Sequence, residues 1–210
     1  MILRLRSSDH WRQPFSMCGV QGWGADDHLR FVATAMTDEA RQTLAVRDVF
    51  AEACLANRPD EYGPIEAEFR YAFVRQHRPQ GVVQIGSGVS TAVVLAGARD
   101  AGYHTEVTCI DPLPAEFLVE AQRRGQIRLI ASPVETLDLE FLAQLTAGDF
   151  FIVDSTHTLG PAGEATRIIL EMLPRLQWGV FVHFHDIWLP DDFDPRIMGR
   201  VCLGTKRRSC

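Results

Sequence analysis

A strand, a glycine turn and a helix start follow one another between Val82 and Ala96. The apolar run from Val82 to Ile85 is typical of a buried strand. Gly86 and Gly88 then form a tight turn, and a helix opens at Ser90 or Thr91. In open α/β sheets, glycines at this place let a ligand come close to backbone N–H groups. The element predicts a fold built around a phosphate- or nucleotide-binding turn.

Strands and helices alternate after this turn. We expect further strands at 106–110, 126–131, 150–153 and 180–184, and helices at 66–76, 91–100, 115–123, 137–145 and 162–176. This alternation predicts an α/β fold with a doubly wound parallel sheet. Because right-handed crossovers bring the C-terminal ends of such strands to one edge, Gly86, Asp111, Asp154 and Asp186 should converge.

The N-terminal segment before this α/β region has a less regular sequence pattern. Thr37 to Cys54 predicts one capped amphipathic helix, which ends at Asn57-Arg58-Pro59. This helix either packs over a face of the sheet or serves as a lid over a substrate. We therefore expect an N-terminal segment at 1–60, an α/β domain at 61–195 and a disordered or truncated tail at 196–210.

The composition of the chain argues against several classes of function. The net charge of −6 argues against a nucleic-acid-binding surface. The only lysine is Lys206, so no lysine base is available in the body of the chain. The five cysteines are scattered with no C-x-x-C pair, which favours a reducing compartment. No apolar run approaches the roughly 20 residues that span a bilayer. We expect a cytoplasmic protein with no membrane partner.

Acidic and imidazole groups follow the expected strands. Asp111 either accepts hydrogen bonds from the ribose hydroxyls of an adenosine ligand or is a turn residue before Pro112. Asp154, His185 and Asp186 could together hold a divalent ion such as Mg²⁺. His157 either takes a proton from a substrate hydroxyl or caps the next helix.

Four blocks carry a family resemblance. They are Ile85-Gly86-Ser87-Gly88-Val89-Ser90-Thr91, Asp111-Pro112, the run from Asp149 to His157, and the run from Gly179 to Ile187. In this order and at these separations, they resemble class I S-adenosylmethionine-dependent methyltransferases, and most closely the small-molecule branch of catechol-type O-methyltransferases. The resemblance covers roughly residues 60 to 195.

The resemblance implies a set of site residues. The methionine part of S-adenosylmethionine would lie over the glycine turn, the ribose on Asp111, and the adenine beside Glu135. Metal-dependent relatives carry a lysine base at the place of His157, an acidic metal ligand at the place of Asp154, and an Asp-Asn pair at the places of His185 and Asp186. The implied cofactor-binding set is Gln84, Gly86, Ser87, Gly88, Ser90, Thr91, Asp111 and Glu135; the catalytic set is His157 and Asp154; the metal set is Asp154, His185 and Asp186.

Two features depart from the family pattern. Gln84 stands where the family has a glutamate that engages the ammonium group of the cofactor, so the charge attraction is lost. The family continues after its fifth strand with a helix and two more strands, whereas residues 196–210 show no strand pattern. An uncovered fifth strand exposes backbone donors and acceptors. We expect either a truncated chain or a homodimer in which a second subunit covers this edge.

Taken together, the residues and the resemblance predict methyl transfer from S-adenosylmethionine to a hydroxyl of a small polar molecule. One rival is a protein that binds the cofactor without activity, which Gln84 and the short C-terminal part favour. A second rival is a metal-dependent hydrolase, which the triplet His183-x-His185-Asp186 suggests.

Overall fold

The computed structural model describes residues 16–17, 20, 24–55, 57, 62–156 and 163–187. Contacts divide the chain into a compact unit of residues 26–185 and a second unit formed by 1–25 and 186–210. The sheet and the site described below belong to the first unit. The domain boundaries expected at residues 60 and 195 stay predictions.

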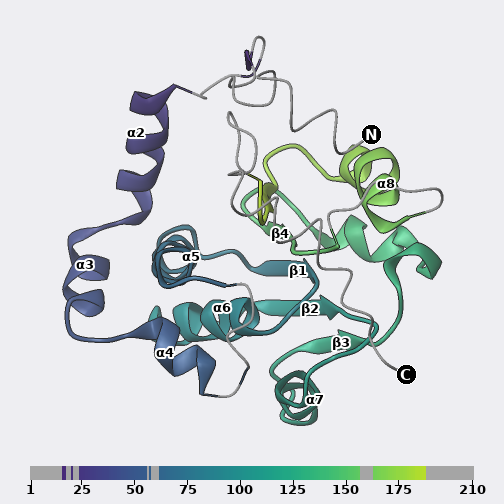
Figure 1. The fold of residues 1–210 in the computed structure, drawn as a ribbon, viewed down its shortest axis with the longest axis horizontal. Coiled ribbons are helices and arrows are strands. Elements are labelled where there is room, and N and C mark those ends of the chain that lie inside the picture. Colours follow the sequence, from purple (N-terminus) through teal and green to yellow (C-terminus); the bar gives the residue numbers. More distant parts are fainter. Residues whose placement is uncertain are drawn as a thin grey trace, which may run out of the picture. The chain divides into compact units, whose positions relative to one another are not determined.

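Five parallel strands form one sheet in the order β3-β2-β1-β4-β5 (Figure 1). They are β1 (Gly81–Ile85), β2 (Glu106–Ile110), β3 (Arg128–Ile130), β4 (Phe150–Val153) and β5 (Phe181–Phe184). The strand order reverses between β1 and β4, and open α/β sheets bind their ligands outside the C-terminal strand ends at such a point. The predicted doubly wound parallel sheet is confirmed.

Helical segments cover both faces of the sheet. The segments α5 (Pro64–His77), α6 (Val89–Asp100) and α7 (Glu116–Arg123) share a buried cluster with Val82 and Phe150. The segments η2 (Val134–Thr136), η3 (Leu139–Gln144) and η4 (Ile168–Met172) share the opposite cluster with Val83 and Phe151. Because neighbouring residues of a strand point to opposite faces, β1 contributes to both cores.

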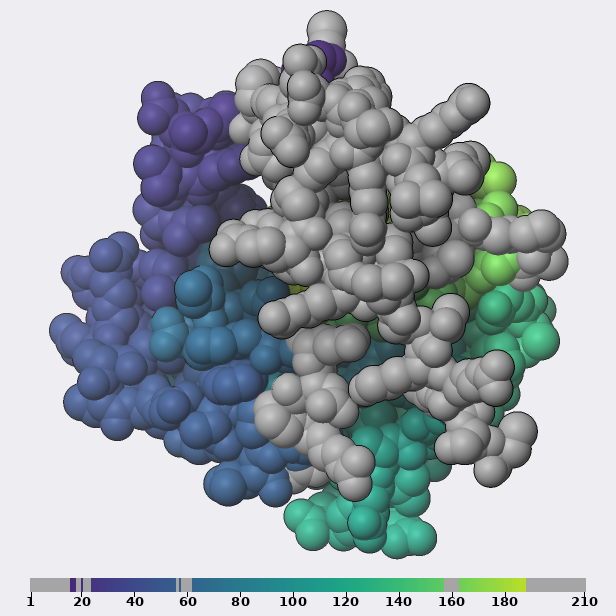
Figure 2. All heavy atoms as spheres, viewed as in Figure 1, coloured from purple at the N-terminus to yellow at the C-terminus, as the bar shows by residue number. Residues whose placement is uncertain are grey.

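The N-terminal helices differ from the expectation. Instead of one helix from Thr37 to Cys54, the chain forms α3 (Asp38–Leu44) and α4 (Val49–Cys54), preceded by an unpredicted α2 (Ala25–Ala35). The Thr37 hydroxyl caps α3 by accepting from the Ala40 N–H at 3.2 Å. The Asp48 carboxylate accepts from the Ala51 N–H at 2.8 Å and starts α4. A cap at Asp48 competes with a continuous helix, so the single-helix prediction is wrong. In Figure 2 these helices form the purple-to-blue surface.

Two other segments that were expected to be α-helices are not regular α-helices in the structure. The segment expected at 162–176 is α8 (Glu164–Arg167), followed by the π-helical η4 and by η5 (Leu173–Arg175), a 3₁₀ turn. Pro174 lies inside this segment and has no N–H to donate, which interrupts a regular α-helix. The segment expected at 137–145 is the 3₁₀ helix η3.

The strand β5 lies at one end of the sheet. Within the described ranges it pairs only with β4, and Val182 is 42% exposed. A second subunit that covers this edge remains a proposal. Among the described residues, no helix is both long and apolar enough to cross a bilayer.

Candidate methyl-transfer site

The glycine turn after β1 lies directly against the end of β4. Gly86 has a φ of +71°, and a β-carbon built on it would lie 1.8 Å from the backbone oxygen of Asp154. The Gly86 N–H donates to the Ile110 carbonyl at 3.0 Å, and the Asp154 N–H donates to the Ile85 carbonyl at 2.8 Å. Only glycine fits this close approach, so the turn is fixed to the ends of β2 and β4.

Asp111 lies beside the same turn. The Ser87 hydroxyl donates to Asp111 Oδ2 at 3.4 Å, while Asp111 Oδ1 accepts from the Leu113 N–H at 2.9 Å. One carboxylate oxygen therefore closes the turn after β2, and the other faces the glycine turn. The structure brings together Gly86, Ser87 and Asp111 as the sequence predicts. The ribose role of Asp111 stays a prediction.

Gln84 joins β1 to the first turn of α6. Its side chain is fully buried, its amide nitrogen donates to the Ser90 hydroxyl, and its amide oxygen accepts from the Thr91 hydroxyl at 3.1 Å. Thr91 Oγ1 also accepts from the Gly88 N–H at 3.4 Å. The polar residues of this segment thus hold the helix start against the strand.

His185 lies between two carboxylates at the C-terminal end of β5. Its Nε2 is 3.1 Å from Glu66 Oε2, and its Nδ1 is 3.3 Å from Asp154 Oδ1. The imidazole is only 3% exposed, whereas the two carboxylates are 45% and 30% exposed. His185 Nε2 is within hydrogen-bonding distance of Glu66, and His185 Nδ1 is within ion-pair distance of Asp154. The group therefore presents two accessible acidic side chains that a buried imidazole holds in place.

A second buried group adjoins His185. The Arg70 guanidinium donates to His183 Nδ1 at 2.7 Å, and its Cζ lies 5.1 Å from the centre of the Tyr62 ring. Tyr62 stacks on His185 with 5.5 Å between ring centres. Burial and then the Arg70 charge lower the pKa of His183 to about 4, so this imidazole is neutral near pH 7 and accepts a hydrogen bond from Arg70. His183 is therefore a paired histidine behind the site.

The predicted metal set is not supported. An imidazole that binds a metal directs a nitrogen lone pair at the ion, but both nitrogens of His185 face carboxylate oxygens. In the described part of the chain, no three His, Cys, Asp or Glu side chains form a group that could hold a metal ion. The hydrolase alternative is not supported either, because His183 Nδ1 accepts a hydrogen bond from Arg70.

The remaining predicted residues lie elsewhere. Glu135 is an exposed residue of η2, in the segment that follows β3. Asp186 follows His185 with a φ of +56° and belongs to the second unit. His157 and the tail at 196–210 lie outside the described residues.

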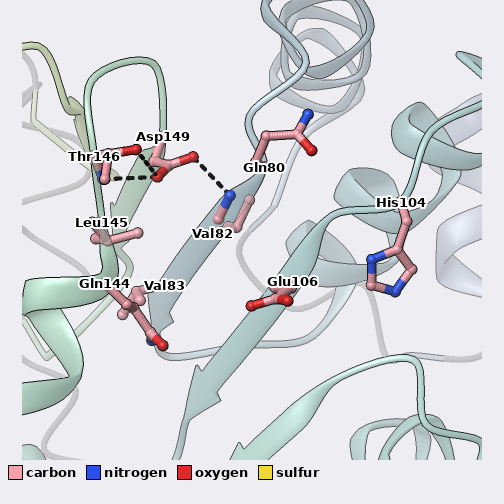
Figure 3. A pocket seen from close by; sticks show the side chains of 10 residues that line it. Gln80, Val82, Val83, His104, Glu106, Gln144, Leu145, Thr146 and Asp149 are labelled. Atoms are coloured by element: carbon pink, nitrogen blue, oxygen red, sulfur yellow. Dashed lines mark hydrogen bonds between the residues drawn. The ribbon is translucent and has the colours of Figure 1, made fainter.

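A cavity at the other edge of the sheet does not belong to this site. Its lining includes Gln80, His104 and Glu106, which precede or begin β1 and β2. Figure 3 shows Asp149 between Thr146 and the start of β1. The Asp149 carboxylate accepts from the Gly81 N–H at 2.7 Å and from the N–H and hydroxyl of Thr146. The structure thus accounts for Asp149 as a clamp on the sheet.

Sequence reasoning missed the residues that α5 contributes. Tyr62 precedes α5, whereas Glu66 and Arg70 belong to it, and all three are more than a hundred residues from β5. The signal for Glu66 was ambiguous, because its carboxylate also accepts from the Gly63 N–H at 2.9 Å, as an ordinary capping residue does. The sequence predicted a helix at 66–76 and gave no sign that this helix contributes polar groups to the site.

The fold and site define a doubly wound α/β domain with a glycine turn and an acidic residue at the ligand-binding edge. A family model described as "Methyltransferase domain" matches residues 83–187, which are 105 of the 210 residues. The chain belongs to this family of methyltransferase domains, in agreement with the predicted resemblance to class I S-adenosylmethionine-dependent methyltransferases. The catechol-type branch stays a prediction.

Two individual proteins are similar to parts of the chain. An uncharacterized protein of Archaeoglobus fulgidus is 31% identical over 87 residues, which are 39% of this chain and 38% of that protein. The chain thus spans less than two fifths of the length of this relative. The crystal structure of the SAH-bound Podospora anserina methyltransferase PaMTH1 covers 71% of this chain and 70% of its own, with 18% identity and a TM-score of 0.48.

Proposed function

We propose that this protein binds S-adenosylmethionine at the C-terminal edge of its sheet and methylates a hydroxyl group of a small polar molecule. The observation that carries the proposal is the meeting of the Gly86 turn with Asp111 and Asp154 at the reversal of the strand order. The family match supports methyl transfer, and the exposed carboxylates next to the turn support a polar acceptor.

The residues of the chain fit the cofactor. The Gly86 turn has no side chain to obstruct a ligand, and the Asp111 carboxylate accepts hydrogen bonds from the two ribose hydroxyls. Ser87 keeps the Asp111 carboxylate in place through the 3.4 Å contact. When bound, S-adenosylmethionine supplies a methyl group that its sulfonium already activates.

The two carboxylates around His185 bind the methyl acceptor. Asp154 is the predicted catalytic residue described at this edge; its carboxylate is 30% exposed and orients the acceptor hydroxyl by accepting its hydrogen bond. Glu66 is 45% exposed and provides a second acceptor oxygen. The proton of the hydroxyl passes to Asp154, or to His157 as the sequence predicts, while the methyl group moves.

Turnover with labelled S-adenosylmethionine and a panel of hydroxylated acceptors tests this function. We expect Asp154→Asn to lower kcat/KM by at least about 100-fold, because a neutral amide does not take up the proton. The matched control is Glu106→Gln, which removes an exposed carboxylate at the opposite edge of the sheet. Cofactor binding without turnover on any acceptor would favour the inactive cofactor-binding protein, and transfer only to amines or thiols would refute the hydroxyl acceptor.

A further inference from the structure

A buried amide oxygen without a partner faces the glycine turn. Asn57 follows α4, and its Oδ1 is buried and makes no hydrogen bond. The Asn57 amide nitrogen donates to the Ala53 carbonyl at 3.1 Å, which fixes the orientation of the side chain. Its oxygen then lies 4.0 Å from the position that a β-carbon would take on Gly88. Asn57 thus presents a fixed acceptor to the turn.

Asn57 Oδ1 lacks a hydrogen-bond donor among the described residues. A buried acceptor without a partner costs roughly 1–3 kcal/mol, and native proteins retain few of them. Within the described residues no protein group satisfies Asn57 Oδ1. The nearest glutamine cannot stand in for it, because both ends of the Gln84 amide already have partners in Ser90 and Thr91. A ligand group over the glycine turn would supply this missing donor.

We propose that Asn57 binds the ammonium group of the cofactor. The inference rests on the proposed function, since only a ligand with an amino-acid end over Gly88 brings a cationic donor to this oxygen. A neutral amide oxygen accepts a charge-assisted hydrogen bond from an ammonium group. Asn57 thereby supplies a hydrogen bond to the ammonium group in a chain that has the neutral Gln84 in place of a glutamate, and the segment after α4 takes part in binding the cofactor.

Calorimetric titration of S-adenosylhomocysteine and of 5′-methylthioadenosine, which lacks the amino-acid end, tests the assignment. We expect Asn57→Leu to weaken the binding of S-adenosylhomocysteine by about tenfold or more, as the loss of a hydrogen bond to a charged group does. Methylthioadenosine should bind the wild type and this variant within about twofold of each other, because its contacts do not reach Asn57. Equal changes for both ligands, or no change for either, would overturn the assignment.

A second variant covers the case in which Asn57→Leu does not fold. Asn57→Asp keeps the shape and adds a negative charge, so its preference for S-adenosylhomocysteine over an analogue without the amino group should rise severalfold above that of the wild type. An unchanged preference would refute the role of Asn57. Failure of the wild type to bind S-adenosylhomocysteine at all would refute the proposed function itself, and this outcome is distinct from binding that Asn57 does not influence.

Discussion

Replacement of Gly86 by alanine tests whether the turn is held by the close approach of β4. Alanine at a φ of +71° costs about 1–2 kcal/mol of backbone strain. Its β-carbon would also lie 1.8 Å from the Asp154 oxygen, so the two chain segments must separate. Separation weakens the hydrogen bonds of Gly86 to Ile110 and of Asp154 to Ile85, at about 0.5–1.5 kcal/mol each. We expect a loss of about 2–4 kcal/mol in the free energy of unfolding.

Urea and thermal unfolding measure this loss. For a chain of this size, the expected destabilisation corresponds to a fall in Tm of roughly 5–15 °C. Gly102→Ala is a matched control, because Gly102 has nearly the same φ of +68° but no atom within 4 Å of its β-carbon position. It should lose only the backbone strain. Equal destabilisation by the two substitutions would show that the contact between Gly86 and Asp154 does not constrain the turn.

Three further predictions concern buried polar groups. His183 has a pKa near 4 in the folded state against an ordinary 6.5, so the unfolded chain binds more protons between these values. The free energy of unfolding should fall by up to about 2–3 kcal/mol as the pH falls from 6.5 to 4. The variant His183→Gln, whose amide oxygen still accepts a hydrogen bond from Arg70, should remove this pH dependence in urea titrations at several pH values. An unchanged pH dependence in the variant would contradict a buried neutral His183. Burial raises the pKa of the Cys109 thiol to about 11, so mass spectrometry should find the partly exposed Cys54 alkylated in the native protein and Cys109 only after unfolding, and the reverse order would refute it. Asp149→Asn should cost about 1–3 kcal/mol, because an amide cannot accept all three bonds of the carboxylate; a cost below 0.5 kcal/mol would contradict its clamping role.

The sequence predicted the parts of the molecule that depend on local pattern and on the rules of parallel sheets. The strand positions follow from short apolar runs, and the convergence of Gly86, Asp111 and Asp154 follows from right-handed crossovers. The requirement for glycine at position 86 could be anticipated only in general terms. The close contact with Asp154 depends on how β4 is placed in the sheet, which no local pattern reveals.

The contribution of α5 to the site could not be predicted from the sequence. Glu66 looks like a helix-capping acid and Arg70 like a charge on a solvated helix face, yet Arg70 is only 3% exposed. Their roles depend on the packing of α5 beside β5, which is a tertiary contact between distant segments. The metal prediction is unsupported for a related reason: the sequence could not show that Glu66 lies on the other side of His185.

Binding of S-adenosylhomocysteine to the wild type and to Asp111→Asn tests the central claim most directly. The control is Asp138→Asn, which changes an exposed acid that caps η3. We predict that the wild type and the control bind with similar affinity in calorimetry. The Asp111→Asn variant should bind at least about tenfold more weakly, because its side chain accepts fewer hydrogen bonds from the ribose. No binding to the wild type, or equal affinity of all three proteins, would contradict a cofactor site between the glycine turn and the end of β2.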